Sequence, residues 1–223
     1  MLSKSKQGEY MKAFYLIIGG LILMSGCSLW HSTELLEIPV TTGQIVSRQS
    51  FTSVDIAGPF TIKYHKGTEH LIRITGDEML VKQVELAYLG DMAHIALPNE
   101  HNKSLFIEIT APSIDAIYLA GAITANFTDL DRDTITIRAA GAYTGTFSGK
   151  AHSVRVTASG AGSIDTTALE AQVVDIEASG ASNVSVWAEK ELAIKAYGAT
   201  TVRYKGTPHI IEQTAGAASI KAL

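Results

Sequence analysis

The sequence is poor in charged residues. Of its 223 residues 18% are charged and 46% are hydrophobic, whereas an ordinary soluble domain has about 25% charged residues. Low charge together with many Gly, Ala, Ser and Thr residues is typical of a β-rich protein with many turns. Long helices would instead be rich in Glu, Lys and Leu. The hydrophobic content is enough for a buried core, which argues against disorder in most of the chain.

The sequence also lacks basic runs and has a single cysteine. No run of Lys or Arg follows residue 12, and the formal net charge is −4. A protein that binds nucleic acid normally needs a basic face to displace phosphate counterions. We therefore predict no nucleic-acid partner. Cys27, being alone, can form neither an intrachain disulfide nor a cysteine-based metal cluster.

The N-terminal segment, up to Cys27, resembles a bacterial lipoprotein signal. Lys12 precedes an apolar stretch (residues 13–24), and the small residues Ser25 and Gly26 lead to Cys27. The stretch is short for a membrane span, but it fits a signal peptide with a processing site. The final LMSGC resembles a lipobox, with Met where Leu is preferred. The resemblance implies that Cys27 is lipidated and becomes the mature N-terminus. The alternative is an inert cysteine after an ordinary signal peptide or anchor helix.

Further expectations concern the start of the chain, its membrane location and the boundary of the folded domain. Either Met1 or Met11 can be the true start, since Met11 opens a signal of ordinary length. Ser28 follows the cysteine, where Asp would imply retention at the inner membrane of enteric bacteria. We therefore expect an outer-membrane lipoprotein, facing the periplasm or the surface and held stably by several acyl chains. Residues 28–46 lack sustained periodicity and are predicted to be a tether, with the folded domain in residues 47–223.

A Gly-Ala step recurs six times at nearly constant intervals. Aliphatic residues alternate with polar ones before most of these steps, as in Ile135, Ile137 and Ala139. This is the period-two pattern of a strand with one buried face. A unit of this length cannot bury its own apolar face, but stacked units can. Glycine suits a sharp bend or a positive φ at each corner. The glycines are Gly121, Gly141, Gly160, Gly180, Gly198 and Gly216.

The repeat predicts an all-β fold, a β-solenoid (right-handed β-helix) with coils of about 18–20 residues. A β-sandwich or barrel is the alternative, but Asn-Gly and Asp-Gly hairpin signals are absent from the repeat region. Residues 48–118 are expected to form the N-terminal cap and first coils. One short helix is predicted there, with Asp77 as its N-cap and Leu80, Val81 and Val84 on its apolar face.

Several segments resemble the auto-transporter adhesin head GIN domain family, from about residue 50 to the C-terminus. The resemblance implies a secreted or lipid-anchored β-helix whose activity is not established. Ala replaces Ser before Gly121, Gly141 and Gly216, and Tyr197 precedes Gly198, which departs from the family pattern. The segments are Gly58-Pro59-Phe60, Gly76-Asp77-Glu78, Pro112, the Ser-Gly-Ala steps at residues 159–161 and 179–181, and residues 202–208.

No group of residues predicts a catalytic, metal or cofactor site. Residues 129–133 alternate acidic side chains like the start of a calcium loop, but Thr134 and Ala140 stand where Gly and Glu are needed. The carboxylates of Asp77 and Glu78 are explained by the helix dipole. None of the seven histidines forms a ligand pair on one element. Aromatic residues could form a sugar-binding stripe or fill the core: Tyr143, Phe147, Trp187, Tyr197 and Tyr204.

Three functions remain open from the sequence. The first is a non-enzymatic, lipid-tethered envelope module that presents a long lateral surface for adhesion or for binding glycan or protein. The second is a polysaccharide-active β-helix enzyme, which needs clustered Asp, Lys or Arg on one face of the sheet. The third is a structural or envelope-stress role. The lack of catalytic groupings favours the first.

Overall fold

The structure is a computed structural model and describes residues 43–98 and 103–223. In these residues twelve strands form one mixed sheet, accompanied by one short helix, α2 (Glu78–Val81), near its N-terminal end. The prediction of an all-β fold with one short helix is confirmed. The strands are β1 (Gln44–Ser47), β2 (Ser53–Ala57), β3 (Phe60–Lys66), β4 (Leu71–Thr75), β5 (Glu85–Leu89), β6 (Met92–Ala96), β7 (Leu105–Ala111), β8 (Ala116–Ala178), β9 (Ala181–Gly198), β10 (Thr201–Lys205), β11 (His209–Gly216) and β12 (Ser219–Ala222).

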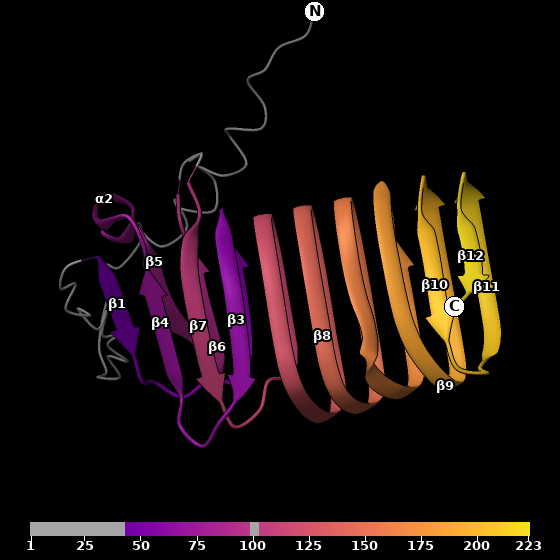
Figure 1. The fold of residues 1–223 in the computed structure, drawn as a ribbon, viewed down its shortest axis with the longest axis horizontal. Coiled ribbons are helices and arrows are strands. Elements are labelled where there is room, and N and C mark those ends of the chain that lie inside the picture. The colour runs from indigo at the N-terminus through magenta and orange to yellow at the C-terminus, as the bar shows by residue number, and fades with distance from the viewer. Residues whose placement is uncertain (1–42, 99–102) are drawn as a thin grey trace, which may run out of the picture. The chain divides into compact units, whose positions relative to one another are not determined.

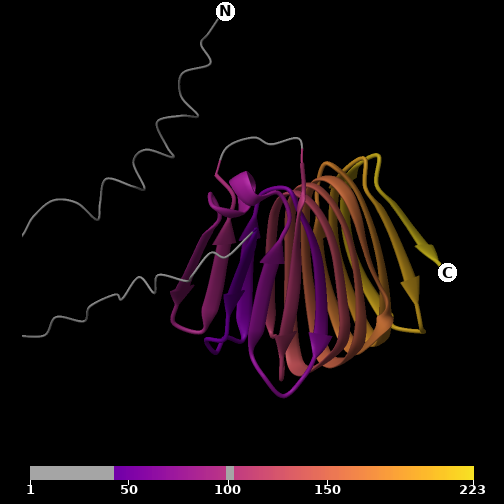
Figure 2. The same ribbon diagram turned by 60° about the vertical axis from the view of Figure 1, so that its left-hand side comes forward.

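The sheet curls like a half-barrel, and its long strand β8 bends repeatedly so that successive passes lie side by side (Figures 1 and 2). The recorded pairings that join β8, β9, β10, β11 and β12 are all parallel. Ile164 is opposite Val184, and Ile176 is opposite Ile194. Segments that are one repeat apart in the sequence therefore become neighbours in the sheet. Hairpins would have given antiparallel pairs instead.

The first part of the chain belongs to the same sheet. Strands β2 and β3 each pair in parallel with β8, while antiparallel pairs occur between β1 and β4, β4 and β7, and β5 and β6. Ile45 of β1 is buried opposite Ile74. The sheet thus begins at Gln44, inside the segment 28–46 that was predicted to be a tether. Residues 44–47 form too short a pattern to be recognised as a strand, since Ile45 is the one fully buried residue among them.

Helix α2 forms where the sequence predicted it but is shorter. The Asp77 carboxylate accepts a hydrogen bond from the Met79 backbone N–H at 3.0 Å, which caps the helix. The Lys103 ammonium, 2.7 Å from Asp77, lowers the pKa of that carboxyl, and the Met79 N–H lowers it further. Leu80 and Val81 are buried. The helix ends before Val84 because strand β5 begins at Glu85.

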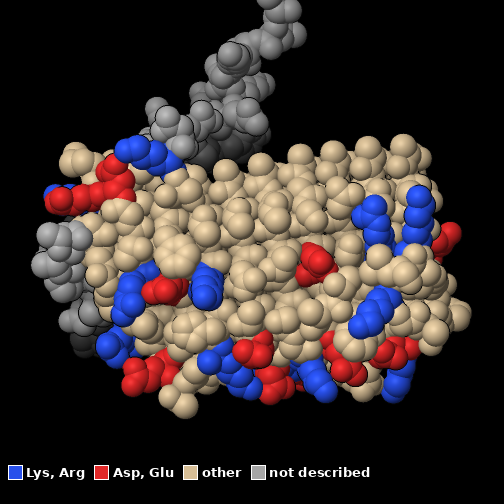
Figure 3. Space-filling view, viewed as in Figure 1, with Lys and Arg blue, Asp and Glu red and all other residues tan. Residues whose placement is uncertain are grey.

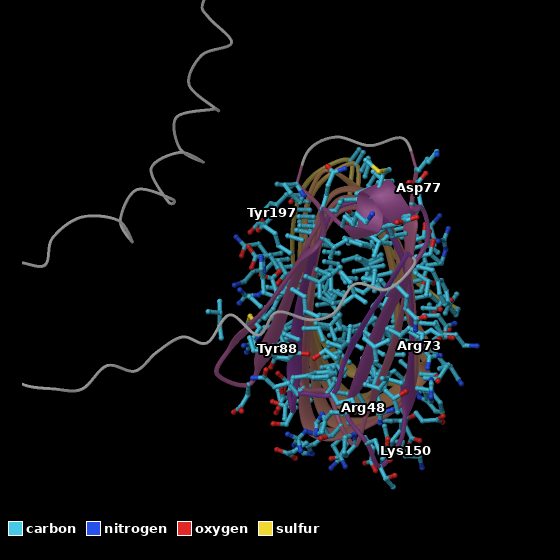
Figure 4. All side chains as sticks on the ribbon, turned by 90° about the vertical axis from the view of Figure 1, so that its left-hand side faces the viewer. Arg48, Arg73, Asp77, Tyr88, Lys150 and Tyr197 are labelled. Atoms are coloured by element: carbon cyan, nitrogen blue, oxygen red, sulfur yellow. The ribbon has the colours of Figure 1, made fainter. Side chains whose placement is uncertain are left out.

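The core lies between the two sides of the curled sheet and is mainly Ile, Val, Leu and Ala. The side chains point alternately into this core and out to solvent, as the burial pattern of β3 illustrates. Three aromatic rings stack inside it. The ring of Phe127 lies 5.5 Å from that of Tyr64 and 5.4 Å from that of Phe147, measured between centroids. Figure 4 looks along the sheet from its N-terminal end and shows side chains filling the space between the two sides.

Cys27 and the predicted signal lie outside the described residues. Among residues 43–98 and 103–223, no helix is long and apolar enough to cross a membrane.

Candidate functional site

The repeated glycines lie on top of one another at one edge of the molecule. All six have positive φ, from 80° at Gly198 to 112° at Gly121. A Cβ atom placed on Gly141 would lie 2.8 Å from the backbone oxygen of Gly121, and one on Gly121 would lie 2.8 Å from that of Gly58. Gly58, in the Gly58-Pro59-Phe60 segment, is therefore the first member of a column of seven. The stack leaves no room for a side chain, so these positions require glycine for both space and conformation.

The glycine column also fixes which outward side chains become neighbours. Residues at equal distances from successive glycines lie on adjacent strands, about 4.8 Å apart. The recorded register agrees, because Asp55 and Tyr118, each three residues before a column glycine, are opposite one another. Once the glycine column is known, the sequence therefore shows which outward-facing residues of successive strands are neighbours.

The row three residues after each glycine carries no charge. Thr61 is opposite Thr124 on β3 and β8, and Asn183 is opposite Thr201 on β9 and β10. Each member bears a hydroxyl or an amide, and each is exposed or half-buried. We call this set the hydroxyl row. In Figure 3 the middle of the upper part of this face is free of charged residues, whereas charges lie at its two ends and gather along the lower edge. The row consists of Thr61, Thr124, Thr144, Ser163, Asn183, Thr201 and Ser219.

A shallow groove of about 250 Å³ lies beside the hydroxyl row. Its polar groups include Asn126, whose amide donates to the Thr146 hydroxyl at 3.0 Å. The Asp165 carboxylate accepts from the Thr167 hydroxyl at 2.7 Å and from the Thr167 backbone N–H at 2.9 Å. Phe127 and Phe147 belong to the strand segments that line the groove, but their rings are buried in the core. The amide, hydroxyl and carboxylate groups of the groove are suited to hydrogen-bonding a neutral sugar. We call this the Asp165 groove.

A second groove, of about 280 Å³, lies on the side of the sheet formed by β2, β6 and the segments of β8 that precede each glycine. The Arg138 guanidinium lies 5.5 Å above the centroid of the Tyr118 ring. Asp55, at the edge of the groove, bonds to His94 at 2.9 Å. The remaining lining residues are Leu119, Ala120, Ala139, Ala140, Thr157 and Ser159. We call this the Arg138 groove.

Comparison with known proteins assigns the family. Residues 50–208 match the family described as "Putative auto-transporter adhesin, head GIN domain". The chain belongs to this family. The match covers the helix, both grooves and most of the hydroxyl row. The matched range includes the Gly58-Pro59-Phe60 segment and the Ser-Gly-Ala steps that carried the resemblance.

A solved structure shares the fold of this GIN domain. A crystal structure described as a putative adhesin from Bacteroides fragilis is 18% identical, with a TM-score of 0.52, and the alignment covers 82% of this chain and 98% of that one. Another from Parabacteroides distasonis is 15% identical with a TM-score of 0.46, over 81% of this chain and 96% of that one. No curated protein matches the chain.

The aromatic residues proposed as a sugar-binding stripe do not form one in the GIN domain. Tyr143 and Phe147 are buried in the core. The Trp187 ring lies under the Lys205 ammonium at 3.5 Å and its N–H bonds to Glu189. Tyr197 and Tyr204 are half-buried. They lie on different sides of the sheet, because Tyr197 precedes the column glycine Gly198 and Tyr204 follows it. Core filling, the alternative given by the sequence, holds for Tyr143 and Phe147.

Several of the acidic and histidine candidates have structural partners. Lys66 bonds to Asp131 at 2.8 Å and lowers the pKa of that carboxyl. His65 bonds to Thr110, and His70 accepts from the Phe51 backbone N–H. In the part of the chain that the structure describes, no group of three or more His, Cys, Asp or Glu residues is arranged to hold a metal ion.

Sequence reasoning missed both the hydroxyl row and the Arg138 groove. The alternation pattern directs attention to the inward, aliphatic positions, and the outward residues vary from one repeat to the next. Aligning the sequence on the six predicted glycines would have revealed the row, because position three after each glycine is always Thr, Ser or Asn. Adding Thr61 to the row required the knowledge that Gly58 joins the column.

Proposed function

We propose that this chain is a lipid-anchored protein of the bacterial outer membrane whose domain is a non-enzymatic adhesion module that binds polysaccharide along its side. We further propose that the domain is a right-handed β-solenoid. Parallel pairing between segments that are one repeat apart supports the solenoid. Membership of a family named for adhesins supports the role in adhesion.

The observation that carries the binding proposal is the hydroxyl row. Seven rungs present uncharged donors and acceptors at the regular spacing of a sheet, about 4.8 Å. A polysaccharide is also a repeating linear array of hydroxyl groups, so it could form the same hydrogen bonds at several successive rungs. Many weak bonds along one polymer add to a useful affinity without any deep pocket. The Asp165 groove, beside the row, would fix the position of one sugar ring.

Binding is tested with the full-length chain in mild detergent on an array of neutral and acidic polysaccharides. We expect retention of at least one neutral polysaccharide, and loss of this retention when Thr144 and Ser163 are both replaced by Glu in mid-row. The matched control is Thr68→Glu, an exposed threonine outside the row. Retention that survives the double replacement, or that falls equally with the control, contradicts the proposal.

The anchor is tested separately by labelling growing cells with a palmitate analogue. We expect the label on the wild-type chain and none on Cys27→Ser, with the wild type in outer-membrane fractions. Label on both proteins would contradict lipidation at Cys27. If the wild type carries the label but fractionates with the inner membrane, the expectation drawn from Ser28 is wrong.

A polysaccharide-active enzyme is the alternative that one specific observation favours. Asp55, Tyr118 and Arg138 lie on successive strands, which brings a carboxylate, a phenol and a cation together on one face. Chain cleavage of an acidic polysaccharide by the full-length protein, lost in Asp55→Asn, would replace the non-enzymatic proposal by this one. Unchanged polymer length after prolonged incubation supports binding without turnover.

A further inference from the structure

We propose that the Arg138 groove binds the carboxylate of an acidic sugar, a uronic acid residue within a polysaccharide. This inference rests on the proposed polysaccharide binding and adds a second site of different chemistry. The groove and the hydroxyl row lie on segments that precede and follow the glycine column, respectively. The two sites can therefore be altered independently.

Arg138 differs from most arginines of the domain because no carboxylate of the described residues neutralises it. Four other arginines each pair with an acidic side chain at 2.8–3.3 Å: Arg48, Arg73, Arg132 and Arg155. Arg138 is exposed and contacts the face of Tyr118 instead. A cation held over an aromatic ring keeps its charge and its hydrogen-bonding edge available.

Arg138 belongs to the row of residues that lie three positions before each column glycine. An acidic residue of this row, Asp55, already has a partner. Asp55 lies beside Tyr118, two strands from Arg138, and bonds to His94 at 2.9 Å. On the other side, Thr157 is the member of the row next to Arg138, and Glu177 follows Thr157. Arg138 is thus the one cation between Asp55 and Glu177 in this row. Each of these acidic residues is two strands away from Arg138, or about 10 Å. This pattern attracts a single carboxylate and disfavours a polymer with a carboxylate on every sugar.

The floor of the groove suits a sugar ring. The row next to the glycine column carries Ala120, Ala140 and Ser159, small residues that leave space beside the long Arg138 side chain. A guanidinium binds a carboxylate through two parallel hydrogen bonds. The Thr157 and Ser159 hydroxyls line the same space and could bond to ring hydroxyls of the sugar. The groove thus offers a planar guanidinium for a carboxylate, an apolar floor for a sugar ring and hydroxyl groups for its hydroxyls. Together these suit a pyranose that carries a carboxylate.

The test uses the full-length chain in mild detergent and calorimetric titration. The acidic probe is a hyaluronan oligosaccharide, in which glucuronic acid alternates with N-acetylglucosamine. The neutral probe is a chitin oligosaccharide of equal length. We expect the acidic probe to bind at least about tenfold more weakly to Arg138→Gln, since the charge-assisted pair is lost. Arg138→Lys should lose most of the affinity too, because an ammonium cannot form the paired bonds.

The matched control is Arg203→Gln. Arg203 is also exposed and has no ion pair among the described residues, but it follows the glycine column and lies on the other side. We expect Arg203→Gln to bind the acidic probe within about twofold of wild type. Equal losses in Arg138→Gln and Arg203→Gln would overturn the site, since nonspecific charge would then explain binding. Thermal unfolding of each variant checks that the fold is retained.

The two proposals fail in different ways. If neutral polysaccharides bind and the hyaluronan oligosaccharide does not, the Arg138 site is wrong and the proposed function stands. If no polysaccharide of either kind binds, both are wrong. An oligogalacturonate, with a carboxylate on every ring, should bind more weakly than the hyaluronan oligosaccharide. Tighter binding of the oligogalacturonate would contradict recognition of a single carboxylate.

Discussion

The Tyr143 hydroxyl is hydrogen-bonded to the Ser182 hydroxyl at 2.7 Å, although the two residues are 39 positions apart in the chain. Ser182 donates to the Ser179 carbonyl at 2.8 Å, so its oxygen accepts from Tyr143. The Tyr143 ring spans the intervening pass of the chain, where Gly162 stands. Burial raises the pKa of Tyr143, while the bond to Ser182 opposes this shift. A buried polar pair is thus satisfied across two units of the repeat.

Replacing Gly162 by Ala is expected to destabilise the domain. Gly162 does not have a positive φ, and the cost arises from space, because a Cβ there would clash with the backbone oxygen of Tyr143 and lie 2.6 Å from Cδ2 of its ring. Overpacking of this kind costs about 1–3 kcal/mol. Urea unfolding of the full-length chain measures it, with Ser163→Ala, on the next, outward-facing residue, as the control. Equal stability of Gly162→Ala and the control would show that the backbone and ring of Tyr143 can both move aside at no cost.

Replacing a column glycine should cost more than replacing an isolated glycine of positive φ. Gly160 has φ +102°, and an added Cβ would clash with the backbone oxygen of Gly141. Gly90 has φ +62° and no atom within 4 Å of an added Cβ. Gly90→Ala therefore measures backbone strain alone, about 1–2 kcal/mol. We expect Gly160→Ala to lower the free energy of unfolding further. Equal losses at the two positions would mean that the backbone contact contributes nothing.

The Phe127 ring should be among the most important single side chains for stability. It is fully buried and stacks on Tyr64 on one side and Phe147 on the other. We expect Phe127→Ala to cost about 3–5 kcal/mol, the range for a large aromatic residue removed from a core. Phe106→Ala, at a half-buried position, is the comparison. A smaller loss for Phe127 than for Phe106 would contradict the stacked core.

Stability should fall in alkaline solution as tyrosines of the unfolded chain ionise. Burial raises the pKa of Tyr64 to about 12, from an ordinary value of 10.0, and the nearby Asp129 adds to the shift. Between pH 10 and 12 the unfolded chain therefore loses this proton while the folded chain keeps it, so the free energy of unfolding decreases as pH rises. Tyr64 contributes at most about 3 kcal/mol to this decrease.

Urea unfolding at several pH values between 9 and about 12 checks the alkaline effect. Tyr64→Phe keeps the ring in the aromatic stack but removes the hydroxyl, which donates to the Ala111 carbonyl at 3.1 Å. We expect this variant to be less stable at neutral pH and to show a weaker dependence on alkaline pH. An unchanged pH dependence in Tyr64→Phe would assign the effect to other tyrosines, since burial also raises the pKa of Tyr88 and Tyr143.

The repeat was readable because its signals are local. Alternation around Ile135 and Ile137, and a glycine at each corner, reflect the side-chain period of a strand and the steric limits of positive φ. Helix α2 was also found from local signals, namely the Asp77 cap and two apolar residues one turn on. Strand β1 was missed because it pairs with β4, which is distant in the sequence, so no local pattern marks it as a strand.

The sequence by itself determined the all-β class, the length of the repeat and the identity of its corner glycines, because each depends on the chemistry of neighbouring residues. Only the tertiary structure decided which outward side chains meet. The hydroxyl row and the contact of Arg138 with Tyr118 exist because stacked passes bring together residues that are one repeat apart in the chain. A single unit contributes one residue to each row and contains no information about its neighbours in space.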